Sequence, residues 1–184
     1  MEITETTVEA VQPSAASDGL YERISAEFGP PLARLARAHE ADPSQQQDLL
    51  QEIHFAIWRS LPAFGGRCSL RTWVYRVAHN VAATHVLRAR RRRSGLLVNL
   101  DDVEIADDSA DAGIVIDEAR ALERLTQLIQ RLKPIDREVI VLHMEALSRD
   151  EIAEITGLAT ANVAIKLHRI KLLLARSFGA RETP

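Results

Sequence analysis

The chain has few of the residues that build crosslinks and metal sites. Cys68 is the only cysteine among 184 residues, so an internal disulfide is excluded and no cage of cysteine thiolates can form around a metal. The six histidines are scattered along the chain without metal-ligand spacing. We therefore expect no metal and no other cofactor, and a reducing, cytoplasmic setting is the simplest interpretation.

Long apolar runs, glycine, proline and aromatic residues are also scarce. No stretch approaches the roughly 20 apolar residues of a membrane-spanning helix. The acidic and polar first residues are unlike a signal peptide, so we expect no membrane insertion. With eight glycines and seven prolines, the composition is dominated by Leu, Ala, Arg and Glu, which favours helix. The length suits one domain or two small ones, each with a modest core.

The chain does have a strong separation of charge. Residues 67–93 contain eight arginines and no acid, and residues 101–118 contain eight acids and no base. The cationic stretch also holds Trp73, Tyr75 and His79, whose flat rings can stack on bases. Arginines interleaved with aromatic rings are suited to gripping a polyanion and stacking on unpaired bases. The alternative interpretation is a solvated helix face.

Apolar periodicity and breaker residues divide the chain into two helical blocks. Residues 1–18 lack periodicity, and we interpret them as a disordered tail. The helical blocks cover 19–93 and 118–178, separated by a flexible acidic linker at 94–117 and followed by a short tail at 179–184. The prediction is an all-α protein of two small helical domains joined by this linker.

The first block is expected to contain three helical segments. An apolar set in residues 20–35 is interrupted at Gly29-Pro30-Pro31, and Asp42-Pro43-Ser44 starts a new helix. The buried stripe of that helix is predicted to be Leu50, Ile53, Ile57 and Leu61. A third helix begins near Ser69, after a loop at 62–66. One face of it carries a hydroxyl, an indole, a cation and an amide: Ser69, Trp73, Arg76 and Asn80.

The strongest local motif lies in the second block. Ser148-Arg149-Asp150-Glu151 forms a capping box, in which hydroxyl and carboxylate each bond a free backbone N–H. Ala153 allows two helices to cross closely, Gly157 suits a left-handed turn, and Val163 anchors the next helix. This spacing is typical of a helix-turn-helix, although plain helical packing is the alternative. The second helix, expected over 160–178, exposes residues suited to DNA grooves and phosphates: Asn162, Lys166, His168, Arg169 and Lys171.

The order of these motifs resembles the extracytoplasmic-function (ECF) sigma factors, small members of the sigma-70 family of bacterial transcription initiation factors. Residues 48–52, 58–64 and 70–80 resemble region 2 of that family. Three later segments resemble region 4: 132–139, 147–157 and 162–169. Both blocks match in the right order with an unmatched linker between them, and this joint match is more specific than either block alone.

The resemblance implies a docking surface and three DNA-binding surfaces. The partners would be the clamp helices of the largest subunit of core RNA polymerase, its flap, promoter DNA and an anti-sigma factor. Residues implied in polymerase binding are Asp48, Leu49, Gln51, Glu52 and Phe55. Those implied in recognising and melting the −10 element are Phe64, Arg67, Ser69, Arg71, Trp73, Arg76 and Asn80. Those implied in holding phosphates are Arg88, Arg90, Arg91, Arg92 and Arg93. Those implied in reading the −35 element are Arg149, Thr160, Asn162, Lys166, His168, Arg169 and Lys171.

Each implied role has a simpler structural alternative. The acidic face could be merely solvated, Trp73 could pack in the core, and Arg76 and Asn80 could serve local structure. The linker is either a plain tether or an anionic mimic of nucleic acid. Two apolar residues, Ala164 and Ile165, stand where the family often has polar ones, which places the −35 preference in doubt.

Two other classes of protein are alternatives. A self-sufficient helix-turn-helix regulator would use the second block alone and leave the first unexplained. An enzyme would need converging carboxylates, a metal cluster or an activated nucleophile. The acids here lie in the linker and on single helix faces, so we expect no catalytic site.

Overall fold

The described part of the chain consists of helices. The computed structural model describes residues 15–94 and 118–179, and no strand occurs within those ranges. The elements are α1 (Ala15–His39), α2 (Pro43–Ser60), the short 3-10 helix η1 (Leu61–Ala63), α3 (Leu70–Ser94), α4 (Glu118–Gln130), α5 (Pro134–Met144), α6 (Arg149–Thr156) and α7 (Thr160–Gly179). The all-α prediction is confirmed. The predicted linker, apart from Ser94, and most of both predicted tails lie outside the described residues.

The first helix differs from the prediction in two ways. α1 begins at Ala15 and therefore includes the end of the predicted tail, and it continues through Pro30 and Pro31. Each proline removes a backbone N–H, which normally weakens a helix interior. Phe28 and Leu32, on either side of the pair, are at most 4% exposed. Because most helix stability in proteins comes from such packing, the buried face holds α1 together where local propensity predicts a break.

The first half of the fold, α1 to α3, is a three-helix bundle. α2 starts where expected, since the Asp42 side chain accepts hydrogen bonds from the backbone N–H groups of Ser44 and Gln45. Its fully buried residues are Leu49, Ile53 and Ile57, so Leu49 replaces the predicted Leu50 in the core stripe. On α3 the innermost residues are Val74, Tyr75, Ala78 and Ala82.

The second half, α4 to α7, contains the predicted helix-turn-helix. Ser148 and Glu151 form both hydrogen bonds of the capping box at the start of α6. Gly157 ends that helix with φ 72°, in the left-handed region where a side chain is strained. Val163 on α7 is fully buried. The predicted helix-turn-helix is confirmed, including its cap at Ser148, its turn at Gly157 and its buried anchor at Val163.

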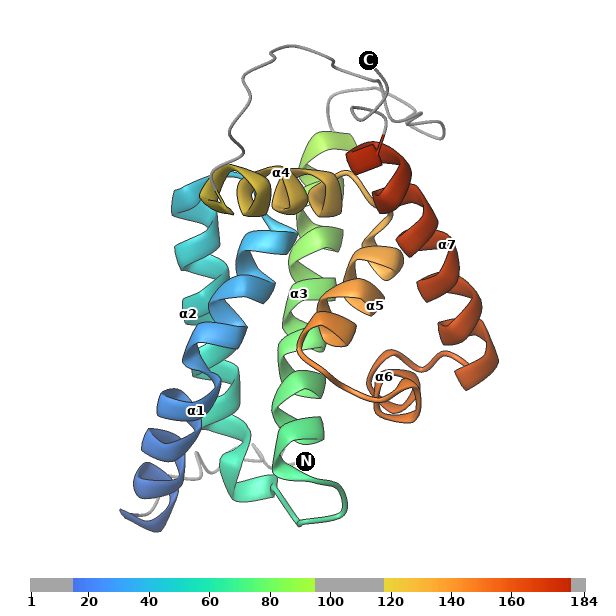
Figure 1. The fold of residues 1–184 in the computed structure, drawn as a ribbon. Helices are drawn as coiled ribbons and strands as arrows, with labels where there is room; N and C mark the ends of the chain where they lie inside the picture. Colours follow the sequence, from blue (N-terminus) through green and yellow to red (C-terminus); the bar gives the residue numbers. More distant parts are fainter. Residues whose placement is uncertain (1–14, 95–117, 180–184) are drawn as a thin grey trace, which may run out of the picture.

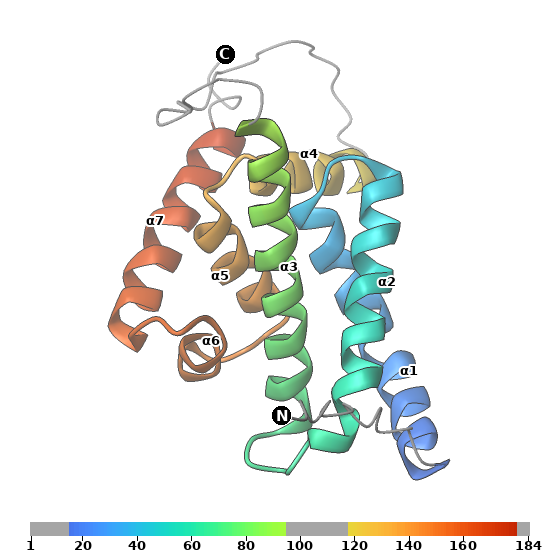
Figure 2. The same cartoon turned by 180° about the vertical axis from the view of Figure 1, so that it is seen from behind.

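The two halves pack against each other along a contact that we call the seam. It joins α1 and α3 on one side to α4, α5 and α6 on the other. α4 lies across the end of α1, and α5 runs beside α3 (Figure 1). The view from behind shows α3 between α2 and the second half (Figure 2).

A buried carboxylate lies at the centre of the seam. Glu138 on α5 is 2% exposed, and its Oε2 lies 2.7 Å from His39 Nε2 on α1. Its other oxygen lies 3.3 Å from His79 Nδ1 on α3. Burial opposes ionisation of this carboxyl, but the hydrogen bonds and charges of the two histidines outweigh that effect and lower its pKa to about 2. The Glu138 side chain on α5 thus contacts α1 and α3 and links the two halves.

We expect this carboxylate to make the fold acid-sensitive. Its folded pKa, about 2, lies below the ordinary value of 4.5. Its stabilising contribution is therefore present above about pH 4.5 and is lost as the pH falls towards 2, amounting to about 3 kcal/mol. Urea unfolding from pH 2 to 7 measures how the free energy of unfolding depends on pH. This dependence should be much weaker in Glu138→Gln. The exposed Glu123→Gln on α4 is the control. If the free energy of unfolding fell equally with pH in wild type and in Glu138→Gln, Glu138 would not be the source of the acid sensitivity.

Candidate nucleic-acid interface

The acidic face predicted to bind a protein partner lies along α2. Asp48, Gln51, Glu52 and Phe55 are all exposed, and the Phe55 ring is 57% accessible. Leu49 is a correction: it is 0% exposed and belongs to the bundle core, because helical spacing turns it inward beside Ile53. The α2 surface therefore offers two acids, an amide and an aromatic ring, all on one side of the helix.

The aromatic and cationic surface forms where the loop after η1 meets the start of α3. Phe64 from the loop packs against Trp73 in a tilted arrangement, with ring centroids 5.1 Å apart and ring planes at 47°. Trp73 is half-buried and packs on the core, as the structural alternative expects, and base capture by its exposed part stays a prediction. Arg67 in the loop and Asn80 on α3 are both exposed. We call Phe64, Arg67, Arg71, Trp73, Arg76 and Asn80 the α3 face.

Ser69 has a local role at this surface. Its hydroxyl oxygen accepts a hydrogen bond from the backbone N–H of Thr72 at 3.0 Å and lies 2.8 Å from the Thr72 hydroxyl. The Ser69 hydroxyl therefore satisfies a free donor at the first turn of α3, as a capping residue does. DNA contact by this side chain stays a prediction, and it would have to compete with the cap.

Two cations of the α3 face are engaged by the second half of the chain. The Arg71 guanidinium donates to the backbone carbonyl of Glu145, at the end of α5. The Arg76 guanidinium pairs with the carboxylate of Glu154 on α6. The conformation described here thus brings the α3 face against the helix-turn-helix.

The arginine cluster lies at the end of α3. Arg88 is exposed and has its Nη1 3.6 Å from a Glu52 carboxylate oxygen, a separation that contributes little in solvent. Arg91 is exposed as well. The side chains of Arg90, Arg92 and Arg93 lie outside the described ones, so their phosphate contacts stay predictions from the sequence.

The surface predicted to read the −35 element lies on α6 and α7. Six of its seven predicted residues are exposed: Arg149, Thr160, Asn162, His168, Arg169 and Lys171. The Thr160 hydroxyl donates to Asp150. Lys166 and Arg169 both donate to Asp136 at 2.7 Å, so one carboxylate on α5 holds two predicted DNA-contacting cations.

Sequence reasoning missed the acids that organise these surfaces. Asp136 and Glu138 stand early in α5, where acids favour the start of a helix whatever else they do, yet both are buried. Glu145 and Glu154 attracted no functional interpretation. Acids in the first turn and on single helix faces carry no local signal of a distant partner, and only apolar neighbours such as Val139 and Ile140 hint that this helix is internal.

The described residues show no feature of a metal centre or a membrane span. Within 15–94 and 118–179, no three His, Cys, Asp or Glu side chains are grouped so as to hold a metal ion. None of the described helices is sufficiently long and apolar to cross a bilayer. Cys68 is a free, half-buried thiol in the loop before α3.

Comparison with known protein families agrees with this division into two modules. The family model for Sigma-70 region 2 matches residues 25–92, and that for Sigma-70, region 4 matches residues 122–174. The first match covers the α2 and α3 surfaces, and the second covers the helix-turn-helix. The chain belongs to the sigma-70 family, in its ECF branch.

Several curated RNA polymerase sigma factors are similar in sequence. The ECF RNA polymerase sigma factor SigG of Mycobacterium tuberculosis is 29% identical over 147 residues, which cover 68% of this chain and 40% of SigG. The chain therefore aligns with less than half the length of that relative. RNA polymerase sigma factor CnrH of Cupriavidus metallidurans is 28% identical over 173 residues, 90% of each chain. YlaC of Bacillus subtilis, an RNA polymerase sigma factor, is 29% identical over 149 residues.

Two solved structures share the fold. CnrH in complex with the cytosolic domain of CnrY gives a TM-score of 0.64 at 23% identity, covering 91% of this chain and 94% of that one. The sigma factor RpoE of Bartonella quintana, in complex with the anti-sigma factor NepR, gives 0.67 at 16% identity, covering 88% and 98%. Because both identities are below 25%, the similarity to these two structures shows a shared arrangement of helices and nothing more.

Proposed function

We propose that this chain is an RNA polymerase sigma factor of the ECF type. It binds core RNA polymerase, directs the enzyme to promoters and melts the −10 element, acting through binding without chemistry of its own. The observation that carries the proposal is the presence of both modules on one chain, in family order. An exposed acidic helix face and an aromatic, cationic α3 face lie on the first module, and a DNA-reading helix lies on the second.

In this proposal the α2 face is the docking surface. Asp48 and Glu52 are exposed and one helical turn apart, so both carboxylates are available to basic groups of the clamp helices. Charge complementarity of this kind speeds association and fixes the register of the complex. Phe55 adds an exposed ring next to the acids, suited to an apolar anchor at the centre of an interface.

The α3 face captures unpaired bases in this proposal. Stacking of a base on an aromatic ring contributes about 1–3 kcal/mol, and Phe64 and Trp73 provide two rings in contact. Asn80 supplies an exposed amide for base edges. Bases held outside the duplex shift the equilibrium towards open DNA, so binding energy alone drives melting and no ATP is needed.

Region 4 supplies the upstream contact. α7 is the recognition helix, entering the major groove at the −35 element, while the polymerase flap holds the module in place. The exposed Asn162, His168 and Lys171 are available for base or phosphate contacts. Ile165, 67% exposed on the same helix, offers apolar contact to thymine methyl groups or to a protein.

Regulation by an anti-sigma factor is part of the proposal. Support comes from the solved structure of RpoE, which holds the anti-sigma factor NepR. Because its proposed target is the bacterial chromosome, we also propose that the chain acts in the cytoplasm.

Binding to core polymerase separates this function from a stand-alone DNA-binding regulator. Mixed with core RNA polymerase and passed over a size-exclusion column, the chain should elute with the enzyme in a one-to-one complex. The free chain should bind duplex DNA weakly. Tight binding of duplex without polymerase, together with no co-elution, would favour the regulator and refute the proposal.

We expect Arg169→Ala to weaken the upstream contact. With polymerase bound, affinity for duplex carrying the −35 element should fall about three- to tenfold, with a shallower salt dependence, because one phosphate or base contact is lost. Fluorescence anisotropy at several salt concentrations measures both. Arg176→Ala, further along α7 and also exposed, is the matched control. Equal affinities for all three proteins would remove Arg169 from the DNA surface.

A further inference from the structure

Ile165 is the most exposed large apolar side chain among the residues that the structure describes. It is 67% exposed and stands on α7, the second helix of the helix-turn-helix. A single exposed apolar side chain is ordinary on a protein surface, so exposure alone assigns no role to Ile165. Its position on α7 and the residues around it do.

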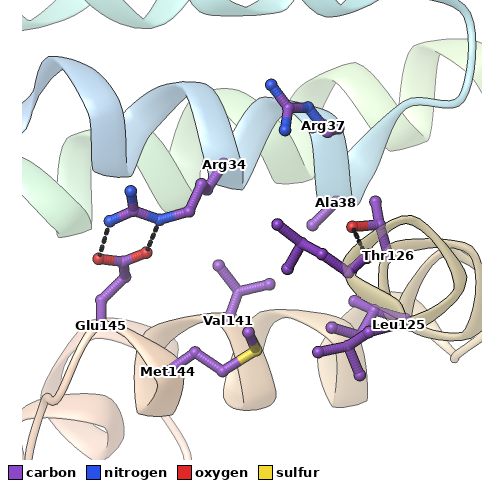
Figure 3. A pocket seen from close by; sticks show the side chains of 10 residues that line it. Arg34, Arg37, Ala38, Leu125, Thr126, Val141, Met144 and Glu145 are labelled. Carbon is purple, nitrogen blue, oxygen red and sulfur yellow. Dashed lines mark hydrogen bonds and ion pairs between the residues drawn. The ribbon is translucent and has the colours of Figure 1, made fainter. Parts of the chain in front are cut away.

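Two other exposed apolar side chains are explained by packing. Leu122 and Met144 line a pocket between α1, α4 and α5. Arg34 and Glu145 close one side of that pocket with a bidentate pair at 2.7 Å, and Met144 lies beside them (Figure 3). These two apolar side chains therefore face a hollow among helices. Ile165 lies on a different helix and does not line that pocket.

Ile165 shares one face of α7 with residues suited to DNA. Four exposed residues recur there at intervals of three and four positions, so they lie on the same side of the helix. We call these four residues the α7 face: Asn162, Ile165, Arg169 and Leu172. The whole of α7 contains two lysines, two arginines and no acidic residue. This charge complements a polyanion, so the structure favours duplex DNA as the occupant of the α7 face.

Ile165 lies in the part of α7 that would reach the bases. It is the sixth residue of the helix and belongs to its second turn. In helix-turn-helix proteins the first turns of the second helix contact base edges in the major groove. Leu172 lies about 10 Å further along the helix axis. Of the two apolar residues on the α7 face, Ile165 is therefore the one expected at a base.

The cations that follow Ile165 have a partner within the second half. Lys166 and Arg169 each donate to Asp136 at 2.7 Å, and the Asp136 carboxylate is buried. These hydrogen bonds restrict the two cationic groups, although the Arg169 side chain is 59% exposed and available to a phosphate. The groups offered to bases at the start of the α7 face are thus the Asn162 amide and the hydrocarbon of Ile165.

We propose that Ile165 is a specificity-determining residue that reads the methyl group of a thymine in the −35 element. The inference rests on the proposed function, because it assigns a base to the recognition helix. Among the groups displayed in the major groove, the thymine methyl is the one that an apolar side chain contacts favourably. Isoleucine has no polar group in its side chain, so it would cover the acceptors of guanine or the amino group of cytosine without a hydrogen bond. The side chain therefore selects thymine both by attraction and by the cost of the alternatives.

Selection from a randomised window tests this preference. About ten base pairs around −35, one helical turn, would be randomised in a promoter that the holoenzyme uses, and the bound duplexes would be sequenced. Wild-type holoenzyme should enrich thymine at one position, and Ile165→Ala should lose that enrichment while keeping the others. Leu172→Ala changes an apolar residue of the same face that is 47% exposed. This matched control should select the same sequences as wild type.

Removing the methyl group alone isolates the contact. In the selected duplex, deoxyuridine would replace the enriched thymine, which keeps the hydrogen-bonding groups and deletes the methyl. The affinity of wild-type holoenzyme should fall about fourfold, the effect of withdrawing one methyl group from an apolar contact. The Ile165→Ala holoenzyme should bind the two duplexes equally. Deoxyuridine at a thymine outside the window is the DNA control and should change neither affinity.

The outcomes separate the inference from the proposed function. Ile165→Ala should fold, because the residue is exposed and alanine favours helix, and it should bind core polymerase as wild type does. Weaker polymerase binding would make Ile165 a protein contact and overturn the inference. Unchanged selection by Ile165→Ala, or an equal loss on deoxyuridine in both proteins, would overturn it too. Failure of the wild-type chain to associate with polymerase would refute the proposed function and the inference together.

Discussion

Replacing Asp48 and Glu52 by lysine is expected to weaken binding to core polymerase strongly. Both side chains are exposed, and each would face a basic group of the clamp helices with the wrong sign. Like charges placed together across an interface cost several kcal/mol. With a loss of about 3 kcal/mol, affinity should fall about 100-fold. Equilibrium titration of labelled chain with core polymerase measures the change.

The fold of this variant should survive. Neither residue contributes to the core, and Arg88, whose guanidinium lies 3.6 Å from the Glu52 carboxylate, is exposed as well. Circular dichroism and the melting temperature should therefore match wild type. Glu22→Lys/Glu27→Lys makes the same change of net charge on exposed positions of α1 and should bind normally. Wild-type affinity in the α2 variant would show that polymerase docks elsewhere.

The second large effect is expected from Asn80→Ala. In the assembled holoenzyme, open-complex formation should fall about 10- to 100-fold, because an amide contact to an unpaired base is lost where each captured base contributes about 1–3 kcal/mol. Polymerase binding should not change, since α2 is untouched. Permanganate reactivity of thymines in the −10 element measures melting, and the titration described above measures binding.

Thr84→Ala is the control for the melting experiment. Thr84 is exposed one turn further along α3 and donates only to the Asn80 backbone carbonyl. Its loss should leave permanganate reactivity at the wild-type level. Asn80 is a cleaner test than Trp73, whose ring also packs on Phe64 and the core, so that Trp73→Ala would mix melting with stability. Equal reactivity in Asn80→Ala and wild type would contradict a role in melting.

Local signals in the sequence predicted the helices and the helix-turn-helix well. The capping box at Ser148 and the left-handed Gly157 are decided by neighbours within a few residues, so the sequence shows them directly. The break predicted at Pro30 and Pro31 was wrong because buried packing of α1 outweighs a local preference. Leu49 was assigned to the surface and Leu50 to the core, although Leu49 is the fully buried one. Adjacent leucines leave the phase of a helix ambiguous by one position.

The seam could not be predicted from local patterns. Arg34 and Glu145 are 111 residues apart, and His39 and Glu138 are 99 apart. Nothing in the sequence near either partner marks the pairing. The arginines of the α3 face carry a signal in the sequence, but which acids meet them depends on how the two halves pack. Arg71 and Arg76, two of the predicted DNA-binding cations, thus have partners across the seam.

Transcription start sites test the central claim most directly. Core RNA polymerase, genomic templates from the source bacterium and the purified chain, free of any inhibitor, would be combined and the 5′ ends of the transcripts mapped. We expect starts at a defined set of sites that are absent without the chain and that share a −10 sequence. Transcripts with the same scattered starts in the presence and absence of the chain would contradict the account.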